Sequence, residues 1–367
     1  MRFAYADEWH KRKLNQICSF YKGNGLSKSD LSKQGKPCIL YGELYTTYKN
    51  EVINVVFSKT NTQLGKPFFS KSNDLIIPAS GEDPIDIAVA RAIYQDNVIL
   101  GGDLNILRPT SNISAAFLSY QLNGVRRYDI AKKAQGKSIV HLHNSELKEI
   151  SVYVPTYDEQ YKIVNLLNNV NQKIKTQNKI IDLLNSQMNY IKKQILDNIT
   201  YKEIKYVNEL CEITTGKRNA NEMNKDGKYK FFTCSKEDYF INAYSFEGEA
   251  LIISGNGELG LIKYYNGKFD AYQRTYVLQN FKCNPKYLMY ILQSKLPRKI
   301  EKEKNIGAMP YIVLKTIETI KVELPDIHEQ LKVVNTVEKF QTKLDNENKL
   351  LELLKKEKCF LLTNLFV

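Results

Sequence analysis

The stretch TTGKRNANE places two cations beside two amide side chains, with Lys217 and Arg218 followed by Asn219 and Asn221. An arginine can donate two hydrogen bonds to one guanine, an asparagine can pair in the same way with adenine, and a lysine can bind a phosphate. These residues are therefore candidates for contact with the bases or phosphates of DNA. Polar loops of this kind are often only solvated turns, and that alternative stays open.

Two further stretches offer side chains of the same kinds. YKGNGLSKSD is a glycine-rich loop with a lysine on either side of an asparagine, and KFDAYQRTYVL has polar side chains directly before a predicted strand. These stretches add Lys22, Asn24, Lys28, Tyr272, Gln273 and Arg274 to the candidates. Arg274 could reach a DNA groove or could equally form an ion pair with a neighbouring carboxylate.

No motif in the chain has the spacing that covalent chemistry or metal binding needs. SGNGELG contains G-x-G-x-x-G, but strand-like segments flank it on both sides, so a hairpin loop is predicted instead of a dinucleotide site. NPKY differs by one residue from the N-P-P-Y signature of amino-methyltransferases, and it is predicted to start a helix with Pro285 at the first position. His141 and His143 have no third ligand nearby, and the six cysteines form no C-x-x-C pair. We therefore expect no catalytic residue, no metal site and no cofactor bound by this chain.

The net charge of +13 is unevenly distributed along the chain. Basic residues exceed acidic ones by 20 to 14 in residues 1–150 and by 19 to 14 in residues 201–320, against 6 to 4 in 151–200 and 8 to 8 in 321–367. An excess that lies almost entirely in two segments indicates a partner that is a polyanion, and double-stranded DNA fits the candidate side chains. The chain has no signal-peptide pattern and no apolar run long enough to span a membrane, so it is expected to be cytoplasmic.

A segment that occurs twice must position these stretches. Shifting the sequence by 170 residues aligns VPTYDEQYKIVNLL with LPDIHEQLKVVNTV, and the alignment continues without a gap to the end of the chain. In both copies apolar residues alternate at spacings of four and three, as in the seam of a coiled coil. Two helices of about 40 residues, each about 60 Å long, are predicted.

The predicted seam includes one polar position in each copy, Gln177 and Glu347. We expect the two helices to pack against each other in antiparallel orientation, with a polar seam residue helping to fix their register. The alternative is that each helix packs only on its own domain. The seam residues chosen as the helix-pair interface are Ile163, Leu167, Val170, Ile174, Gln177, Ile181, Leu184, Val337, Phe340, Leu344, Glu347, Leu351 and Leu354.

The segments outside the helices repeat each other loosely, and each mixes strand-like and helix-like patterns. VNELCEITTGK matches LNQICSFYKG, ALIISGNGE matches LIIPASGED, and RTYVLQ matches the end of NVILGGDLNILRP, which is predicted to be one strand with a glycine kink. The sequence therefore predicts an α+β protein with a domain at 1–150, a spacer helix at 151–200, a second domain at 201–320 and a second spacer helix at 321–367.

This order of domain, LPxxxEQ-type helix, domain and LPxxxEQ-type helix resembles the specificity subunit of type I restriction-modification enzymes. The strings WHKRKL, AQGKSIVHLHNSELK, TTGKRNANE, SGNGELG and KFDAYQRTYVL carry the resemblance as well. It covers essentially the whole chain, and the repeated helix entries are its most specific part. One departure is that the chain begins almost directly at the Trp9 region.

The resemblance implies two target-recognition domains, each reading one half of a split DNA site, and a helix pair that sets the spacing. It further implies two modification subunits that bring S-adenosylmethionine and methylate adenine. A restriction subunit that uses ATP and Mg could join them. The chain itself is expected to be a non-catalytic subunit of that enzyme. Two alternatives are a DNA-bridging, architectural coiled-coil protein with no enzymatic partner and a self-contained methyltransferase with degenerate motifs.

Overall fold

The chain folds into two compact units, and each unit takes part of both long helices. The computed structural model describes residues 9–63, 65–198, 200, 203–237, 239–303 and 310–366. Unit 1 consists of Met1–Lys179 with Asn348–Val367, and unit 2 of Ile180–Glu347. The units therefore cut across the predicted boundaries, because each half of a long helix belongs with the domain beside it.

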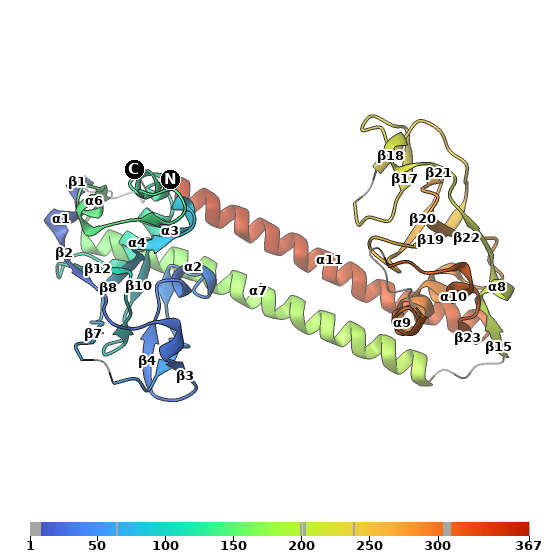
Figure 1. Ribbon diagram of the computed structural model, residues 1–367, viewed down its shortest axis with the longest axis horizontal. Coiled ribbons are helices and arrows are strands. Elements are labelled where there is room, and N and C mark those ends of the chain that lie inside the picture. Colours follow the sequence, from blue (N-terminus) through green and yellow to red (C-terminus); the bar gives the residue numbers. More distant parts are fainter. Residues whose placement is uncertain are drawn as a thin grey trace. The chain divides into compact units, whose positions relative to one another are not determined.

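The two predicted long helices are confirmed as α7 (Tyr157–Asn198) and α11 (Ile327–Asn364), which have 42 and 38 residues. Unit 1 contains the beginning of α7 and the end of α11, whereas unit 2 contains the end of α7 and the beginning of α11. The helices consequently run in opposite directions, as predicted (Figure 1). Apolar residues at spacings of three and four give each helix one face to bury, and this burial is what stabilises a helix of such length.

The described part of unit 1 is built around two five-stranded sheets, with two two-stranded sheets and short helices beside them. Its strands are β1 (His10–Lys13), β2 (Cys18–Lys22), β3 (Leu31–Ser32), β4 (Lys36–Ile39), β5 (Val52–Ile53), β6 (Lys59–Thr60), β7 (Phe68–Phe69), β8 (Asp74–Pro78), β9 (Ser80–Gly81), β10 (Arg91–Ile93), β11 (Ile99–Leu100), β12 (Leu104–Pro109), β13 (Val140–His141) and β14 (Ser151–Val154). Its helices are α1 (Leu14–Ile17), η1 (Lys28–Asp30), α2 (Glu43–Thr46), α3 (Pro84–Ile87), α4 (Ala115–Asn123), α5 (Arg127–Ala131) and α6 (Asn144–Lys148). The larger sheets have the orders β2-β12-β8-β10-β5 and β3-β6-β4-β11-β7, and β1 pairs with β14.

Unit 2 is a reduced version of the same plan. Its strands are β15 (Glu203–Tyr206), β16 (Glu212–Thr215), β17 (Tyr229–Phe232), β18 (Tyr239–Ile241), β19 (Glu249–Ser254), β20 (Ile262–Asn266), β21 (Phe269–Ala271), β22 (Thr275–Gln279) and β23 (Lys321–Leu324). Its helices are α8 (Val207–Leu210), η2 (Ala220–Glu222), α9 (Pro285–Glu303) and α10 (Leu314–Glu318). The sheets have the orders β16-β22-β19-β20 and β18-β17-β21, and β15 pairs with β23.

The strand pairings confirm the predicted internal repeat. In unit 1, β12 lies antiparallel between β2 and β8, and in unit 2, β22 lies antiparallel between β16 and β19. The pairs β4–β11 and β17–β21 are both parallel. Helix α9 begins at Pro285, as predicted. The prediction of one kinked strand in NVILGGDLNILRP is wrong, because the chain turns at Gly101, Gly102 and Asp103 and places β11 and β12 in different sheets.

The repeated E-Q pair at the start of each long helix anchors that helix to its unit. The Gln160 side chain accepts a hydrogen bond from the backbone N–H of Ser114, the N-cap of α4, and donates to the Pro155 carbonyl (2.9 and 3.1 Å). Gln330 does the same with Asn284, directly before α9, and with Pro325 (2.8 and 2.9 Å). Both glutamines are buried. Each accepts a hydrogen bond from a backbone N–H at a helix start, where no intrahelical carbonyl is available.

The end of α11 is held in unit 1 by an aromatic cluster and an ion pair. The Phe366 ring lies 5.5 Å from that of Phe117 and 6.4 Å from that of Trp9 between centroids. The buried Glu51 carboxylate lies 2.9 Å from the Lys358 ammonium and also accepts a hydrogen bond from Asn171 on α7 at 3.0 Å. The terminal segment therefore packs against the first domain, not the second, which the predicted antiparallel arrangement requires.

Candidate nucleic-acid interface

In unit 2, two of the stretches chosen from the sequence lie side by side. The chain leaves β16 at Gly216, whose N–H donates to the Thr275 carbonyl at 3.0 Å. Two residues later, the Arg218 carbonyl accepts a hydrogen bond from the Gln273 N–H at 2.9 Å, and Arg218 forms a parallel bridge with Tyr272. These hydrogen bonds join residues 217–221 to residues 272–274 in one polar surface, which we call the unit 2 loop pair.

The close approach of these two segments requires a glycine. A Cβ on Gly216 would lie 2.1 Å from the Ala271 carbonyl oxygen, well inside any real contact distance. A side chain at this position would force the segments apart. Gly216 therefore determines how close the loop pair can be.

Arg218 is held by two carboxylates. Its Nε lies 3.1 Å from Oδ2 of Asp270, which is fully buried, and its Nη1 lies 3.2 Å from Oε2 of Glu222. Asp270 is itself fixed by the Ser245 hydroxyl, which donates to it at 2.8 Å. The hydrogen bond and charge of Asp270, with a smaller contribution from Glu222, raise the pKa of Arg218 above its ordinary value. Only the remaining N–H groups of Arg218 are available to DNA, so its main effect is to fix the shape of the loop.

The other candidates of unit 2 are exposed, with the exception of Tyr272. Lys217, Asn219 and Asn221 point at least partly into solvent, and the Asn219 N–H donates to Glu222 at 2.7 Å at the start of η2. Tyr272 is half-buried, whereas Gln273 and Arg274 are exposed. Within the described part of the chain, no carboxylate forms an ion pair with Arg274.

The glycine-rich hairpin adjoins the same surface. Strands β19 and β20 pair antiparallel on either side of SGNGELG, so the predicted hairpin is confirmed. The Gly255 N–H donates to the Arg274 carbonyl at 2.9 Å, and a Cβ on Gly255 would lie 2.5 Å from that oxygen. Three loops from distant parts of the sequence thus meet around Arg274.

Unit 1 builds its first loop in the same way. The Gly23 N–H donates to the Leu104 carbonyl at 2.9 Å, and a Cβ on Gly23 would lie 1.9 Å from the Gly101 carbonyl oxygen. Lys22 ends β2, Asn24 follows, and Lys28 begins η1; all three are exposed. The Asn24 amide donates to the Lys66 carbonyl at 2.9 Å, which leaves its oxygen free of this bond.

The two surfaces share a backbone and differ in their side chains. Ala79 in unit 1 donates its N–H to the Asp103 carbonyl at 2.7 Å, just as Gly255 in unit 2 donates to Arg274. These matching hydrogen bonds make Asp103 and Arg274 equivalent, and both side chains are exposed. Where one unit presents a carboxylate, the other presents a guanidinium. Opposite charges at this one position would favour different base edges, because a carboxylate can only accept hydrogen bonds and a guanidinium can only donate them.

Burial along the long helices follows the spacing of the chosen seam. Ile163, Leu167, Val170, Gln177, Leu184, Val337, Leu344 and Leu351 are buried, and Ile174, Ile181, Phe340, Glu347 and Leu354 are half-buried. None of these residues faces solvent fully. The structure thus places all of them on the inner face of their helix.

The outer faces of the long helices carry apolar side chains at repeated positions. On the described part of α7 the exposed large apolar residues are Tyr157, Tyr161, Ile180, Leu183 and Tyr190, and on α11 they are Ile327, Leu331, Leu350, Leu353 and Phe360. Each residue of the first set has its counterpart 170 residues later in the second, and all are between 37% and 64% exposed. Because of the antiparallel arrangement, each unit contains all five positions once, two from one helix and three from the other. Exposed apolar patches of this kind mark interaction surfaces.

Other kinds of site find no support in the described residues. They contain no group of three or more histidine, cysteine or acidic residues placed to hold a metal ion, and no helix long and apolar enough to cross a membrane. Burial raises the pKa of the Cys18, Cys211 and Cys283 thiols to about 12, so these cysteines are poor nucleophiles.

Comparison with known proteins decides the family. The model of the type I restriction modification DNA specificity domain matches residues 6–186 and again residues 199–356. The chain belongs to this family. The two matches coincide with the two copies of the internal repeat, each a domain followed by its long helix.

Among characterised specificity subunits, the type I restriction enzyme EcoDI specificity subunit of Escherichia coli is 35% identical over 144 residues. That alignment covers 39% of this chain and only 32% of the E. coli protein. The MjaVIII specificity subunit of Methanocaldococcus jannaschii is 22% identical, with 96% of this chain and 89% of that one aligned. The crystal structure of an S subunit from M. genitalium has the same fold, with a TM-score of 0.65, 18% identity and coverage of 100% and 97%.

Sequence reasoning missed several residues that shape the specificity-domain surface. Asp270 lies within KFDAYQRTYVL, but nothing in the string indicates that it is buried under Arg218. The sequence did contain a signal for the close approach of the chain at these glycines, since Gly216 aligns with Gly23 in the internal repeat. The ion pair between Glu51 and Lys358 joins residues 307 apart, and no local pattern indicates it.

Proposed function

We propose that this chain is the specificity subunit of a type I restriction-modification enzyme and that each unit reads one half of a bipartite, asymmetric DNA site. The proposal rests on the two loop surfaces at Gly23 in unit 1 and Gly216 in unit 2. They have equivalent backbone hydrogen bonds but opposite charges at one equivalent position, Asp103 and Arg274. Two loop backbones of the same geometry that carry different side chains suit a protein that binds two different DNA sequences in the same manner. In unit 2, Lys217, Asn219, Asn221, Gln273 and Arg274 are the contact residues, and Arg218 positions them.

Rigid helices convert residue number into distance, so the helix pair is proposed to set the spacing between the half-sites. The chain makes or breaks no covalent bond. Two modification subunits would bring S-adenosylmethionine and methylate an adenine flipped out of each half-site, and a restriction subunit would use ATP and Mg. Their chemistry lies outside this chain.

The repeated apolar positions on the outer helix faces support docking of two copies of one partner. A partner that binds twice needs the same surface twice, and each unit provides the same five positions. We propose that the modification subunits bind there, with Leu183 and Leu353 as equivalent contacts, both about 60% exposed.

Mixing this chain with its modification subunit and measuring the mass of the complex tests the docking. Wild type is expected to bind two copies, Leu183→Glu or Leu353→Glu one copy, and the double variant none, because a buried carboxylate without a partner opposes association. Lys173→Glu and Lys343→Glu are the control, since these exposed lysines lie roughly 80° round the helix from the two leucines. Full assembly of the double leucine variant would refute the docking surface.

Selection of bound duplexes from a randomised library tests DNA recognition. The proposal predicts two separated sequence blocks that differ from each other. An architectural DNA-bridging protein would instead select no sequence and would show only steep salt dependence.

A further inference from the structure

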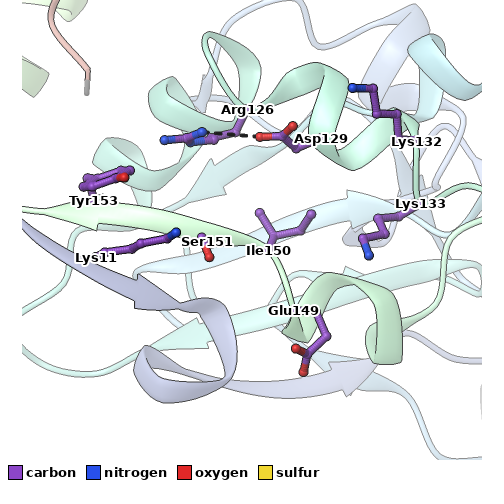
Figure 2. A pocket seen from close by; sticks show the side chains of 9 residues that line it. All are labelled: Lys11, Arg126, Asp129, Lys132, Lys133, Glu149, Ile150, Ser151 and Tyr153. Atoms are coloured by element: carbon purple, nitrogen blue, oxygen red, sulfur yellow. Dashed lines mark hydrogen bonds and ion pairs between the residues drawn. The ribbon is translucent and has the colours of Figure 1, made fainter.

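A second cationic surface lies in unit 1, away from the loop at Lys22. It is a groove of about 450 Å³ lined by residues of β1, β14 and the segment around α5. Figure 2 shows its cationic side chains around Ile150 and Ser151, with Lys11 coming from β1 and Arg126, Lys132 and Lys133 from the opposite wall. Strand β2, about 17 Å long at 3.3 Å per residue, and the short helix α1 separate β1 from Lys22.

The carboxylates of this groove already have cationic partners. Glu149 lies 2.5 Å from the ammonium of Lys13, and Asp129 lies 3.4 Å from Nη1 of Arg126. The Arg126 guanidinium also lies over the Tyr153 ring, 5.2 Å from the ring centroid. The Lys13 ammonium, with a smaller contribution from Lys133, lowers the pKa of Glu149.

Three lysines remain in excess. Lys11, Lys132 and Lys133 are exposed, and none of them forms an ion pair with a carboxylate of the described residues. Like charges held around one groove repel each other, and an anion in the groove would remove that repulsion. Polyanions with regularly spaced phosphates suit several lysines at once.

The described residues of unit 2 do not repeat the lining of this groove. The register of β1 with β14 and of β15 with β23 makes Lys11 equivalent to Ile204 and Tyr153 equivalent to Glu323. In unit 2, Glu323 is bound by Lys295 of α9. A partner that docks equivalently on both units would meet this surface only once. DNA needs no second copy of this surface, because phosphate contacts on one side of the site already add affinity.

We propose that Lys11, Lys132 and Lys133 form a second DNA-binding site that grips the phosphate backbone beside the half-site read by unit 1. The inference rests on the proposed function, since it assumes that unit 1 holds DNA. The site contributes affinity without sequence preference, because phosphate contacts carry no base information.

The test compares Lys132→Ala/Lys133→Ala with the matched double variant Lys49→Ala/Lys71→Ala. Both remove two exposed lysines from unit 1, but Lys49 and Lys71 lie outside the groove. Binding of the selected target duplex is measured as a function of salt, using the full chain with its modification subunit. Each lost phosphate contact reduces the slope of log K against log salt by about 0.9, so the groove variant is expected to lose up to about 1.8 and the control none.

Hydroxyl-radical footprinting of the same complexes locates the contact. The groove variant is expected to lose protected sugars on one side of the site only, with the selected sequence unchanged. An unaltered slope and footprint in a complex that still selects its target would overturn the groove while leaving the proposed function intact. Loss of the modification subunit with an unaltered slope would also overturn it, since it would show that the groove binds protein. If wild type itself selects no sequence, the proposed function fails first.

Discussion

Replacing Gly216 with alanine is expected to damage recognition of one half-site and spare the other. The added Cβ would lie 2.1 Å from the Ala271 carbonyl oxygen, whereas real contacts of this kind stay above 3.0 Å. The two loop segments must therefore separate by about 1 Å, which lengthens the hydrogen bonds Gly216 N–Thr275 O and Gln273 N–Arg218 O from 3.0 and 2.9 Å. Two such bonds are together worth about 2 kcal/mol, and a misplaced base contact costs about 1–3 kcal/mol.

The chain offers its own matched variants for this prediction. Gly23→Ala should cause the same damage in unit 1, since its Cβ would lie 1.9 Å from the Gly101 oxygen. Gly102→Ala should be neutral, because no atom lies within 4 Å of the added Cβ. The assay is binding to duplexes in which one half of the selected site is randomised. We expect each damaging variant to lose roughly tenfold to a hundredfold discrimination in its own half. Equal loss in both halves, or a large effect of Gly102→Ala, would refute the reasoning.

Three further changes have defined outcomes. Lys358→Met introduces the residue found 170 positions earlier and should leave the Glu51 carboxylate buried without its ammonium. Hydrogen exchange of residues 348–364 should show that the free energy of opening this segment falls by about 2–3 kcal/mol, and adding Glu51→Gln should restore part of that stability. Inserting seven residues after Lys179 and seven after Glu347 keeps the seam in phase and lengthens each helix by about 10 Å. The spacer between the two halves of the DNA site should then grow by about three base pairs, and an unchanged spacer would contradict the proposed role of the helices. The exposed Cys359 should be alkylated quickly at pH 8, and the buried Cys18, Cys211 and Cys283 only on unfolding. Because burial raises the pKa of these three buried thiols from 9.0 to about 12, their contribution to stability is present below pH 9 and is lost as the pH rises towards 12.

The long helices could be predicted because their seam is a local pattern. Ile163, Leu167 and Val170 lie within a few turns of each other, so their periodicity is visible without any tertiary information. The apolar stripes also indicated that the two helices pack on each other, whereas their antiparallel orientation was an expectation that the stripes alone do not determine. The looser repeat of the segments outside the helices supplied strand correspondences of the two units as well, such as that of VNELCEITTGK with LNQICSFYKG.

The details of the candidate site depend on contacts that no local pattern contains. The sequence suggests that Arg218 is a base-reading side chain, but in the folded chain Asp270, 52 residues away, fixes its guanidinium. The sequence left Arg274 open between an ion pair with a carboxylate and contact with a DNA groove, and only the folded loops show that the side chain is exposed. Burial of a carboxylate is a tertiary property, because the same aspartate in a loop would be solvated.

Mapping of methylated adenines tests the central claim most directly. The chain is combined with its modification subunit, and the modified sites are compared between wild type and a variant with Lys217→Ala, Gln273→Ala and Arg274→Ala in unit 2. The account predicts a two-block motif with a fixed gap for wild type, and a variant that alters one block while the other block and the gap stay the same. A single continuous motif, or equal change of both blocks, would contradict it.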